Sequence, residues 1–270
     1  MKNALQLLAM GALLLLKPNA NPPREAVTQS PETPVDRTPV VVELFTSEGC
    51  STCPPADELL SKLETDQPIQ DAEIIGLEEH VDYWNHDGWV DSYSSPDWTL
   101  RQQEYVLRFK GKSPFTPQMI VDGQRQFVGN NARDAQDAIR EAAHRVKTQV
   151  SIAAETASRT DAPRFEVRIG NATGIPDREP ADVWMAVTED GLETAVKAGE
   201  NAGKNLQHAA ILRSLHKIGV VPFSGSAPLV LNQQVKFKPN WKLENLRIVI
   251  FVQERKSLRI LGAASARVAG

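Results

Sequence analysis

Two cysteines between a run of apolar residues and a segment with helical periodicity constrain this chain more than any other feature. Cys50 and Cys53 are its only cysteines, and residues 40–45 before them are almost all β-branched, aromatic or leucine. Such a run is typical of a strand covered on both faces of a sheet. Pro54 and Pro55 suit the first turn of a helix, where no backbone N–H is needed as a donor. The sequence therefore predicts a strand, a tight loop that carries both thiols, and a helix.

This arrangement places the thiols at the N-terminus of a helix, where the positive end of the helix dipole favours the reactive thiolate. A pair with this spacing can form, open and transfer a disulfide. We expect Cys50 to be the more exposed, attacking sulfur and Cys53 to be the resolving sulfur. Glu48, Asp57 and Glu58 add negative charge that opposes the dipole. An inert structural disulfide and half of a metal site are the alternative interpretations.

Composition and charge exclude several other classes of function. The chain has 270 residues, 41% of them hydrophobic, and a formal net charge of -4. It has no basic run and no interleaving of aromatic and basic residues, so we expect no nucleic-acid partner. Residues 199–205 resemble a phosphate loop, but the glycines are one residue too close and Asn205 replaces the Ser or Thr that binds magnesium. We interpret this segment as a polar turn, and we expect no nucleotide or flavin cofactor.

The N-terminal segment has the pattern of an export signal. Lys2 precedes an apolar run over residues 4–16, and residues 1–20 have the length of a signal peptide rather than of a membrane span. Residues 21–39 contain five prolines among polar residues and are predicted to be an extended linker. The cleavage site is not defined, so an uncleaved anchor is the one membrane contact that the sequence allows. Export to the periplasm or outside the cell places the cysteines in an oxidising compartment.

The next elements bring further polar residues to the cysteine edge. A second strand is expected at residues 72–81, and a strand, helix, strand order with short links predicts a parallel pair joined by a right-handed crossover. Both strands then end at one edge of the sheet, so His80 is expected beside Cys50. A helix is predicted from Ser95 and Pro96 to about Gly111.

The loop before that helix carries Trp84 and Trp89. Their aromatic rings either pack the helix onto the sheet or form the wall of an apolar substrate groove beside the cysteines.

The rest of the chain changes character near residue 149. Residues 118–121 and 126–128 are predicted to form a hairpin around Asp122 and Gly123, and Asn130 or Asn131 to cap a helix with an apolar face over residues 135–146. Beyond it, alternating strands are predicted at residues 150–156, 165–169, 183–187, 229–235 and 246–252. We therefore predict an α/β domain at residues 40–148 and an antiparallel β-sandwich-like domain at residues 149–270.

The order of elements in residues 40–148, with the cysteine pair after the first strand and Thr116-Pro117 before the hairpin, resembles the thioredoxin fold. The resemblance implies a cis Pro117 lying against the cysteines. More closely, ELFTSEGCSTCPPAD at residues 43–57, HVDYW at 80–84 and ENAGKN at 200–205 resemble a bacterial family of exported thioredoxin-like proteins of unknown function. This similarity runs from about Val40 to about Gly219. Ser51 and Thr52 replace the Gly-Pro of thioredoxin, so a thioredoxin-like redox potential does not follow.

The leading hypothesis is an exported thiol–disulfide oxidoreductase that acts on protein thiols and depends on a redox partner. Cys50 and Cys53 would react, and Pro117 with Thr116 would shape the edge where the client docks, next to Trp84 and Trp89. The sequence leaves open whether the protein is an enzyme at all.

Two other hypotheses stay open. The first is a copper- or zinc-delivery protein, which would use the two cysteines as soft ligands and His80 as an imidazole ligand. The second is a non-catalytic binding module in which the two cysteines form a structural disulfide. Glu79, Asp82 and His86 are further candidates for proton transfer to the thiols.

Overall fold

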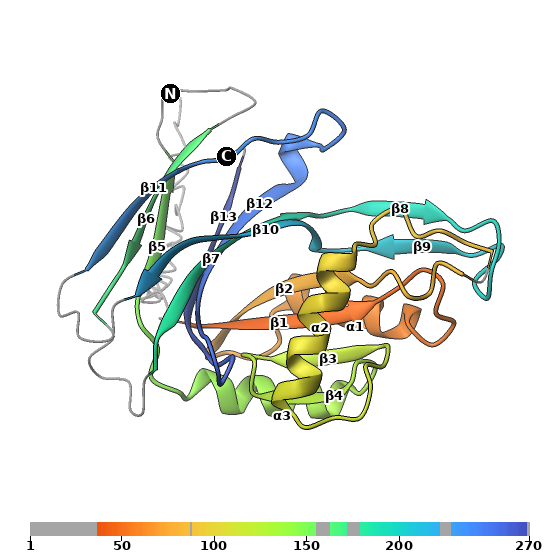
Figure 1. Ribbon diagram of the computed structural model, residues 1–270, viewed down its shortest axis with the longest axis horizontal. Coiled ribbons are helices and arrows are strands. Elements are labelled where there is room, and N and C mark those ends of the chain that lie inside the picture. The colour runs from red at the N-terminus through yellow and green to blue at the C-terminus, as the bar shows by residue number, and fades with distance from the viewer. Residues whose placement is uncertain (1–36, 87, 155–162, 172–178, 222–227, 269–270) are drawn as a thin grey trace, which may run out of the picture. The chain divides into compact units, whose positions relative to one another are not determined.

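The computed structural model describes residues 37–86, 88–154, 163–171, 179–221 and 228–268 (Figure 1). The predicted export signal at residues 1–20 lies outside these residues, and so does most of the predicted linker. Among the described helices, none has the length and apolar character needed to cross a membrane. The described strands form a sheet of eight strands, a sheet of three strands and a two-stranded hairpin.

The cysteine region folds as the predicted strand, helix and strand. Strand β1 (Thr38–Thr46) and strand β2 (Ala72–His80) are parallel and are joined by helix α1 (Pro54–Asp66). Residues 40–46 are fully buried, which accounts for their nearly continuous apolar sequence. β1 starts two residues earlier than predicted because Thr38 and Pro39 already pair with the start of β2.

The following elements also match the prediction closely. Helix α2 (Pro96–Arg108) is capped by Ser95, strands β3 (Gln118–Val121) and β4 (Arg125–Val128) form a hairpin, and helix α3 (Ala132–Ala143) is capped by Asn131. Asp122 and Gly123 both have positive φ, as tight hairpin turns require. The Thr116–Pro117 bond is cis, as the resemblance implied. α2 ends before Gly111, and α3 ends before Val146, which is exposed instead of lying on its apolar face.

The described residues of the second half form nine strands and one short 3-10 helix, η1. Five of the strands were predicted, whereas β8, β9, β10 and β13 were not. The elements are β5 (Val150–Ala154), β6 (Arg164–Ile169), β7 (Ala181–Glu189), β8 (Leu192–Ala195), β9 (Asn205–His208), β10 (Ile211–Val221), β11 (Leu229–Gln234), η1 (Leu243–Asn245), β12 (Leu246–Glu254) and β13 (Ile260–Arg267).

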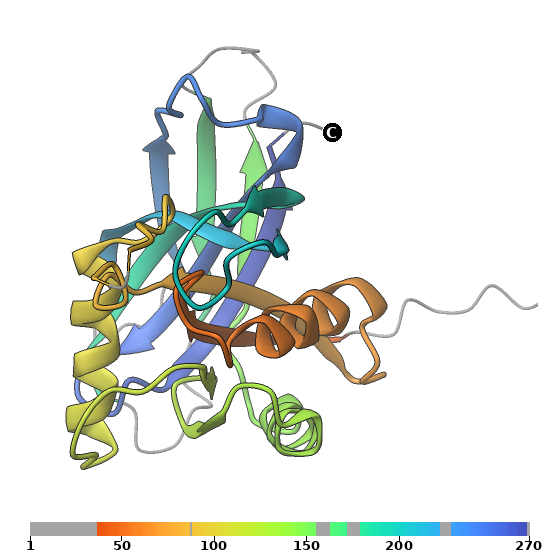
Figure 2. The same ribbon diagram turned by 90° about the vertical axis from the view of Figure 1, so that its right-hand side faces the viewer.

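One large sheet contains strands from both halves of the chain. Its order is β13-β12-β7-β10-β2-β1-β3-β4, and β10 joins β2 in parallel where Ile211 lies opposite Glu78 (Figures 1 and 2). β10 thereby covers an edge of β2 that would otherwise offer unpaired backbone groups. The protein is therefore a mixed α/β fold with a large central sheet and few helices. The division into domains at residues 148 and 149 stays a prediction.

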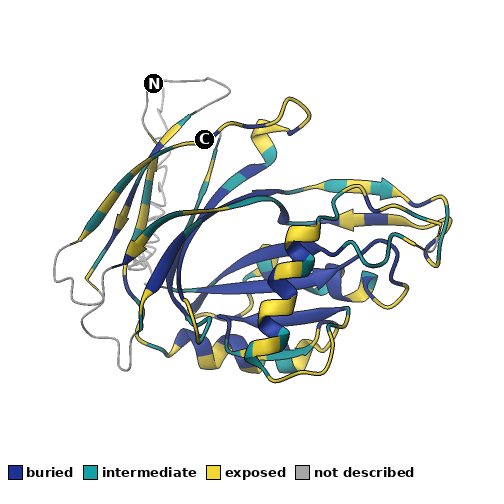
Figure 3. Cartoon of the chain, viewed as in Figure 1, coloured by how far each residue is buried: buried dark blue, intermediate teal, exposed yellow. Residues whose placement is uncertain are grey.

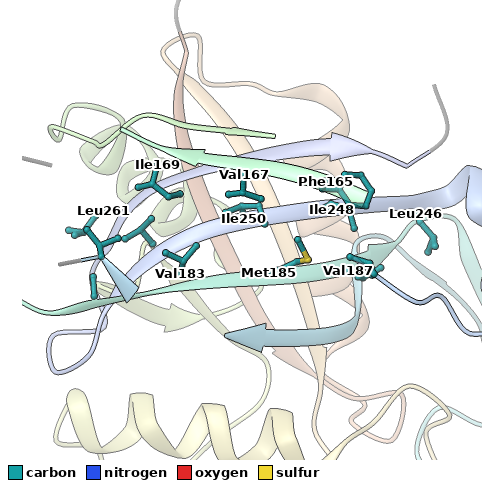
Figure 4. Packing of buried hydrophobic residues seen from close by; sticks show 14 of the residues in the cluster. Phe165, Val167, Ile169, Val183, Met185, Val187, Leu246, Ile248, Ile250 and Leu261 are labelled. Carbon is teal, nitrogen blue, oxygen red and sulfur yellow. The ribbon is translucent and has the colours of Figure 1, made fainter. Parts of the chain in front are cut away.

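The three-stranded sheet β11-β6-β5 packs over the β7 and β12 end of the large sheet. Figure 4 shows the side chains of β6 facing those of β7 and β12 in a single apolar cluster. β6 and β11 alternate between buried or half-buried and more exposed residues, whereas β1, β2, β7 and β12 of the large sheet are buried along most of their length (Figure 3). Burial thus alternates in β6 and β11 as predicted, whereas the alternation predicted for β7 and β12 is wrong, because both strands are covered on both faces.

A buried charged group ties α2 to both halves of the large sheet. Arg101 on α2 donates from Nε to Glu43 Oε1 of β1 at 2.6 Å. Tyr105 on α2 also donates to the Glu43 carboxylate, and Gln253 of β12 donates from Nε2 to Tyr105 Oη at 2.9 Å. Arg101 and Glu43 are 7% and 0% exposed, so neither charge has water as a substitute partner.

We predict that Arg101→Ala lowers the free energy of unfolding by about 3–5 kcal/mol, because it leaves the Glu43 carboxylate buried without its cation. Arg140→Ala is the matched control, since its ion pair with Asp137 is about half exposed; it should change stability by less than about 1 kcal/mol. Urea unfolding followed by circular dichroism measures both. A loss in Arg101→Ala no larger than in the control would show that the buried group does not hold α2 in place.

Candidate functional site

The two cysteines form a closed disulfide in the loop between β1 and α1. The S–S distance is 2.17 Å and the Cα atoms lie 5.4 Å apart. Cys53 is the N-cap residue of α1, so the pair lies at the start of the helix as predicted. Cys50 is 1% exposed and Cys53 is 0% exposed. Both cysteines are therefore buried in this closed state, and the assignment of Cys50 as the more exposed, attacking sulfur stays a prediction.

A turn from the second half of the chain covers the cysteine loop. The turn joins β8 to β9, and Figure 2 shows it beside the loop that follows β1. Asn201, which is fully buried, donates from Nδ2 to the backbone oxygens of Glu48 at 2.8 Å and of Cys50 at 2.9 Å. The Ser51 N–H donates to Glu200 Oε2 at 3.0 Å. Residues 199–204 thus form the predicted polar turn, and we call this turn the cover.

A group of buried ionisable side chains lies next to the cysteine loop. His80 Nδ1 is 2.7 Å from Asp91 Oδ2, and His80 Nε2 is 3.0 Å from Glu78 Oε1. His208 Nδ1 is 2.8 Å from the same Glu78 oxygen, and His208 Nε2 is 3.3 Å from Glu48 Oε1. All five residues are buried, with at most 3% exposure. We call Glu48, Glu78, His80, Asp91 and His208 the histidine cluster.

Sheet pairing explains how residues so far apart in the sequence meet. Glu78 and His80 lie two positions apart at the end of β2, so their side chains share one face of the sheet. β10 pairs with β2 at Glu78, and the Glu78 N–H donates to the Ala210 carbonyl at 2.9 Å. The Ala209 N–H donates to Glu78 Oε2 at 3.0 Å. These bonds hold the end of β9 against β2 and so place His208 beside His80.

The charges of the cluster fix the protonation of both imidazoles. Burial by itself lowers the pKa of His80, but Asp91 and Glu78 outweigh it and hold that pKa well above its usual value. Burial also lowers the pKa of His208, whereas Glu78 and Glu48 raise it to about 9. In return the two imidazoles keep the pKa of Glu78 below its usual value in spite of burial. Near neutral pH both histidines are therefore imidazolium ions held between carboxylates.

Asp57 lies one helical turn beyond Cys53 and faces the same region. Its N–H donates to the Cys53 carbonyl at 3.2 Å, and its Oδ1 accepts from Thr46 Oγ1 at 2.6 Å. Burial, followed by the negative charge of Glu78, raises the pKa of Asp57 to about 7. A carboxyl group that exchanges its proton near neutrality therefore lies one turn from the inner cysteine.

The predicted docking residues surround the cysteine loop. Trp84 Nε1 donates to Thr116 Oγ1 at 2.7 Å, and Trp89 Nε1 donates to Glu48 Oε2 at 2.7 Å. Both rings are half-buried, and Trp84 packs against a cluster that includes Phe45. Trp84 also closely approaches Gly49, where an added Cβ would lie 3.1 Å from the Trp84 Cβ. Trp84 therefore packs beside the sheet and α2, Trp89 is tied to the loop through Glu48, and the use of either ring to bind a client stays a prediction.

The cis proline lies near the start of α1. A Cβ added at Gly129 would lie 3.1 Å from the Pro117 Cβ and 3.2 Å from the Ala56 Cβ, so Pro117 and the first turn of α1 are close neighbours. Pro117 is buried and Thr116 is half-buried. The structure thus brings Trp84, Thr116 and Pro117 to one side of the cysteine loop.

The three residues considered for proton transfer lie elsewhere. Glu79 is 3.6 Å from Arg101 in the other buried charged group, where burial and the nearby Glu43 carboxylate raise its pKa well above the usual value. Asp82 accepts from Thr99 Oγ1 at 2.6 Å, and His86 is exposed. His80 belongs to the histidine cluster, and both of its ring nitrogens face carboxylates. Among the described residues, the side chains placed to hold a metal ion are His80, Glu78 and His208. The cysteines are not part of this group.

Sequence reasoning missed His208, Asp91 and Glu78 and treated Asp57 only as a negative charge. The alternation of buried Leu206 and His208 in β9 was one available signal. The position of Asp57 on the apolar face of α1 with Ala56 and Leu60 was another.

A groove of about 990 Å³ opens elsewhere, between α2 and the strands of the second half. Its lining includes Tyr93, Trp184 and Trp241 but neither cysteine, and neither Trp84 nor Trp89. Tyr93 connects the groove to the histidine cluster, since its ring centroid lies 5.6 Å from those of both His80 and His208. The groove between α2 and the second half is therefore a different one from the apolar groove that was expected beside the cysteines.

Comparisons with known proteins place the chain in a family. No functionally curated protein matches it. The crystal structure of the protein AGR_C_4864 from Agrobacterium tumefaciens is similar, with 26% identity, a TM-score of 0.62, and coverage of 85% of this chain and 94% of that one. HBP35 of Porphyromonas gingivalis has a similar fold, with 16% identity, a TM-score of 0.64, and coverage of 86% of this chain and 76% of that one.

The family model described as "Protein of unknown function (DUF1223)" matches residues 41–253. This range contains the cysteine loop, the cover and the whole histidine cluster. It also agrees with the resemblance to a family of unknown function that the sequence around residues 43–57 predicted. The chain belongs to the DUF1223 family.

Proposed function

We propose that this protein is an exported thiol–disulfide exchange protein that acts on protein thiols. The observation that carries the proposal is the Cys50–Cys53 disulfide at the start of α1, with the ionisable Asp57 one turn behind its inner sulfur. Helix N-termini favour thiolates, and a buried group with a pKa near 7 suits proton transfer at neutral pH.

The arrangement of the first half supports a thioredoxin-like identity for this region. Strands β2-β1-β3-β4 lie side by side in that order, with β1 and β2 parallel, β3 antiparallel to β1, and β4 antiparallel to β3. The cis Thr116–Pro117 bond lies next to the first turn of α1. Because one fold serves many functions, the proposal rests on the cysteine site and not on this resemblance.

One cycle of exchange transfers two electrons from the client to the cysteine pair. A client thiolate attacks the Cys50 sulfur, a mixed disulfide forms, and Cys53 leaves as a thiolate that takes a proton from Asp57. A second client thiolate then attacks the mixed disulfide and releases Cys50. The client dithiol is thereby oxidised to a disulfide, the cysteine pair is reduced to a dithiol, and a separate redox partner must accept the two electrons. The reverse sequence reduces a client disulfide.

The cover has to move before either sulfur can react. Both cysteines are buried, and Asn201 holds the backbone oxygens on both sides of Gly49. Exchange is therefore controlled by opening of the residues 199–204 turn. Such control would limit reaction to partners that displace the turn, and it would keep the disulfide from small thiols in solution.

The test of the function uses the cysteines directly. Cys50→Ser should abolish exchange with reduced or scrambled protein substrates, because the disulfide can no longer form and the attacking thiol is missing. Cys53→Ser should instead accumulate a mixed disulfide with the client, since the resolving thiol is missing. The reduction potential of the wild-type pair should lie between about -120 and -270 mV, the range of exchange catalysts. A potential below about -300 mV with unchanged substrate turnover in Cys50→Ser would refute the proposal.

The control by the cover is tested by Asn201→Ala. Losing two hydrogen bonds to the cysteine loop should speed reduction of the disulfide by small thiols about tenfold or more. Asn205→Ala is the matched control, because Asn205 lies at the end of the same turn, is exposed, and bonds to Glu193 rather than to the loop. Trapping of free thiols over time measures the rate at which the disulfide is reduced. Equal rates in the two variants would show that the turn does not limit access to the disulfide.

The raised pKa of Asp57 predicts how the free energy of unfolding changes with pH. Its folded pKa of about 7 lies above the usual 3.8, so ionisation costs the folded state stability as pH rises between these values, and the full cost applies above pH 7. Asp57→Asn removes this cost while keeping an acceptor for Thr46. The variant should therefore gain stability over wild type between pH 5 and pH 8, by roughly 2–3 kcal/mol across that interval.

Urea unfolding at both pH values measures the gain, and the exposed Asp137→Asn serves as control with little expected change. A gain that does not grow with pH would mean that Asp57 is already ionised in the folded protein below pH 5. The proton-transfer role assigned to Asp57 would then fail, although the role of the cysteines would stand.

A further inference from the structure

Three ligand atoms of the histidine cluster converge on one point in the protein interior. Glu78 Oε1 lies 3.0 Å from His80 Nε2 and 2.8 Å from His208 Nδ1. All three atoms lie within 4.8 Å of one another. Ligand atoms around a tetrahedral Zn²⁺ ion are separated by about 3.3 Å, since each is about 2.0–2.1 Å from the metal. The three groups therefore need only small shifts to enclose an ion.

We propose that Glu78, His80 and His208 form a binding site for a divalent transition-metal ion of the zinc class. The site is new relative to the metal hypothesis drawn from the sequence, which joined His80 to the two cysteines. Here both sulfurs are bonded to each other, and the ligands come from β2 and β9. The proposal stands independently of thiol exchange.

The outer nitrogen of His80 is held by a carboxylate as in metal sites, and the outer nitrogen of His208 lies beside a second carboxylate. His80 Nδ1 faces Asp91 at 2.7 Å, and His208 Nε2 faces Glu48 at 3.3 Å. Histidine ligands commonly donate their second N–H to a carboxylate, which fixes the tautomer and the ring orientation. The arrangement thus selects Nε2 of His80 and Nδ1 of His208 as the metal-binding atoms.

The carboxylates behind the histidines are themselves fixed. The backbone N–H groups of Glu48 and Tyr93 both donate to Asp91, at 2.9 Å each. Trp89 Nε1 donates to the other oxygen of Glu48. The carboxylates that face the histidines are therefore themselves held by hydrogen bonds. A simple ion pair between buried residues does not require this additional support.

The charge balance of the cluster allows a metal to replace protons. One carboxylate oxygen of Glu78 faces a nitrogen of each of two imidazole rings, whose centroids are 4.9 Å apart. A divalent ion at that point would take the place of the protons that these contacts share, and it would keep positive charge beside the carboxylate. The outer nitrogen of His80 would keep its hydrogen bond to Asp91, and that of His208 would stay paired with Glu48 at 3.3 Å. Binding therefore leaves no carboxylate of the cluster without a cationic or N–H partner.

The donor set indicates the class of metal. Two imidazole nitrogens and one carboxylate oxygen suit Zn²⁺, Co²⁺ and similar borderline ions. Ca²⁺ and Mg²⁺ prefer oxygen ligands alone, and Cu⁺ prefers sulfur. Three protein ligands leave a coordination position for water, as in hydrolytic zinc sites.

The experiment uses the full chain after treatment with a chelator, with Zn²⁺ titrated by calorimetry and Co²⁺ titrated by visible absorption. We expect one ion per chain with a Kd below about 10 µM, and a Co²⁺ spectrum typical of tetrahedral nitrogen and oxygen ligation. His208→Ala should lose this binding, whereas His216→Ala should keep it, because His216 is exposed on the neighbouring β10.

Further variants keep the test decisive if His208→Ala does not fold. Asp91→Asn retains all ligands but changes the carboxylate behind His80, and it should weaken Zn²⁺ binding by about 10–100-fold. Wild-type protein without stoichiometric binding would overturn the site, and so would binding that is equal in Asp91→Asn and wild type. Binding lost in a Cys50→Ser and Cys53→Ser double variant, or a Co²⁺ spectrum with sulfur charge-transfer bands, would assign the ion to the cysteines instead.

Discussion

The pairing of β10 with β2 at Glu78 is the contact on which the rest of the structure depends. It extends the β2-β1-β3-β4 sheet into the second half of the chain, and it holds the end of β9 against the carboxyl end of β2. The Glu78 side chain then receives the Ala209 N–H and both histidines. A single buried carboxylate thus links the backbone pairing of the two halves to the polar group beside the disulfide.

Strand β2 carries charge on both of its faces, which is unusual for a central strand. Glu78 and His80 face α1, where Asp57 lies, whereas Glu79 faces α2 and its Arg101. Each set is compensated from a distant part of the sequence, by His208 on one face and by Arg101 on the other. Since an unpaired buried charge costs several kcal/mol, the two faces make the relative positions of α1, α2, β2 and β9 interdependent. The geometry of the cysteine loop depends on the same contacts through Glu48 and Asn201.

The local elements could be predicted from the sequence because their signals are local. The buried run of β1, the prolines that open α1, the Ser95 and Asn131 caps and the Asp122-Gly123 turn each act within a few residues. The shared sheet could not be predicted, since parallel pairing of β10 with β2 joins residues more than a hundred positions apart and leaves no periodic trace. His208 was missed for the same reason. The sequence did contain one signal of a buried polar site. Glu78, Glu79 and His80 are three consecutive ionisable residues at the end of a strand whose other residues are typical of a core.

The cover gives the buried disulfide and the histidine cluster a common physical control. Asn201 and Glu200 hold the cysteine loop from outside, while His208, at the end of the same β8–β9 hairpin, reaches Glu48 from within. Moving the hairpin away from the loop would therefore break the hydrogen bonds between the cover and the cysteine loop and separate His208 from two carboxylates at once. Losing that buried ion pairing costs far more than losing two hydrogen bonds. Opening by rotation of the turn alone, with β9 left in place, is consequently the less costly route to the disulfide.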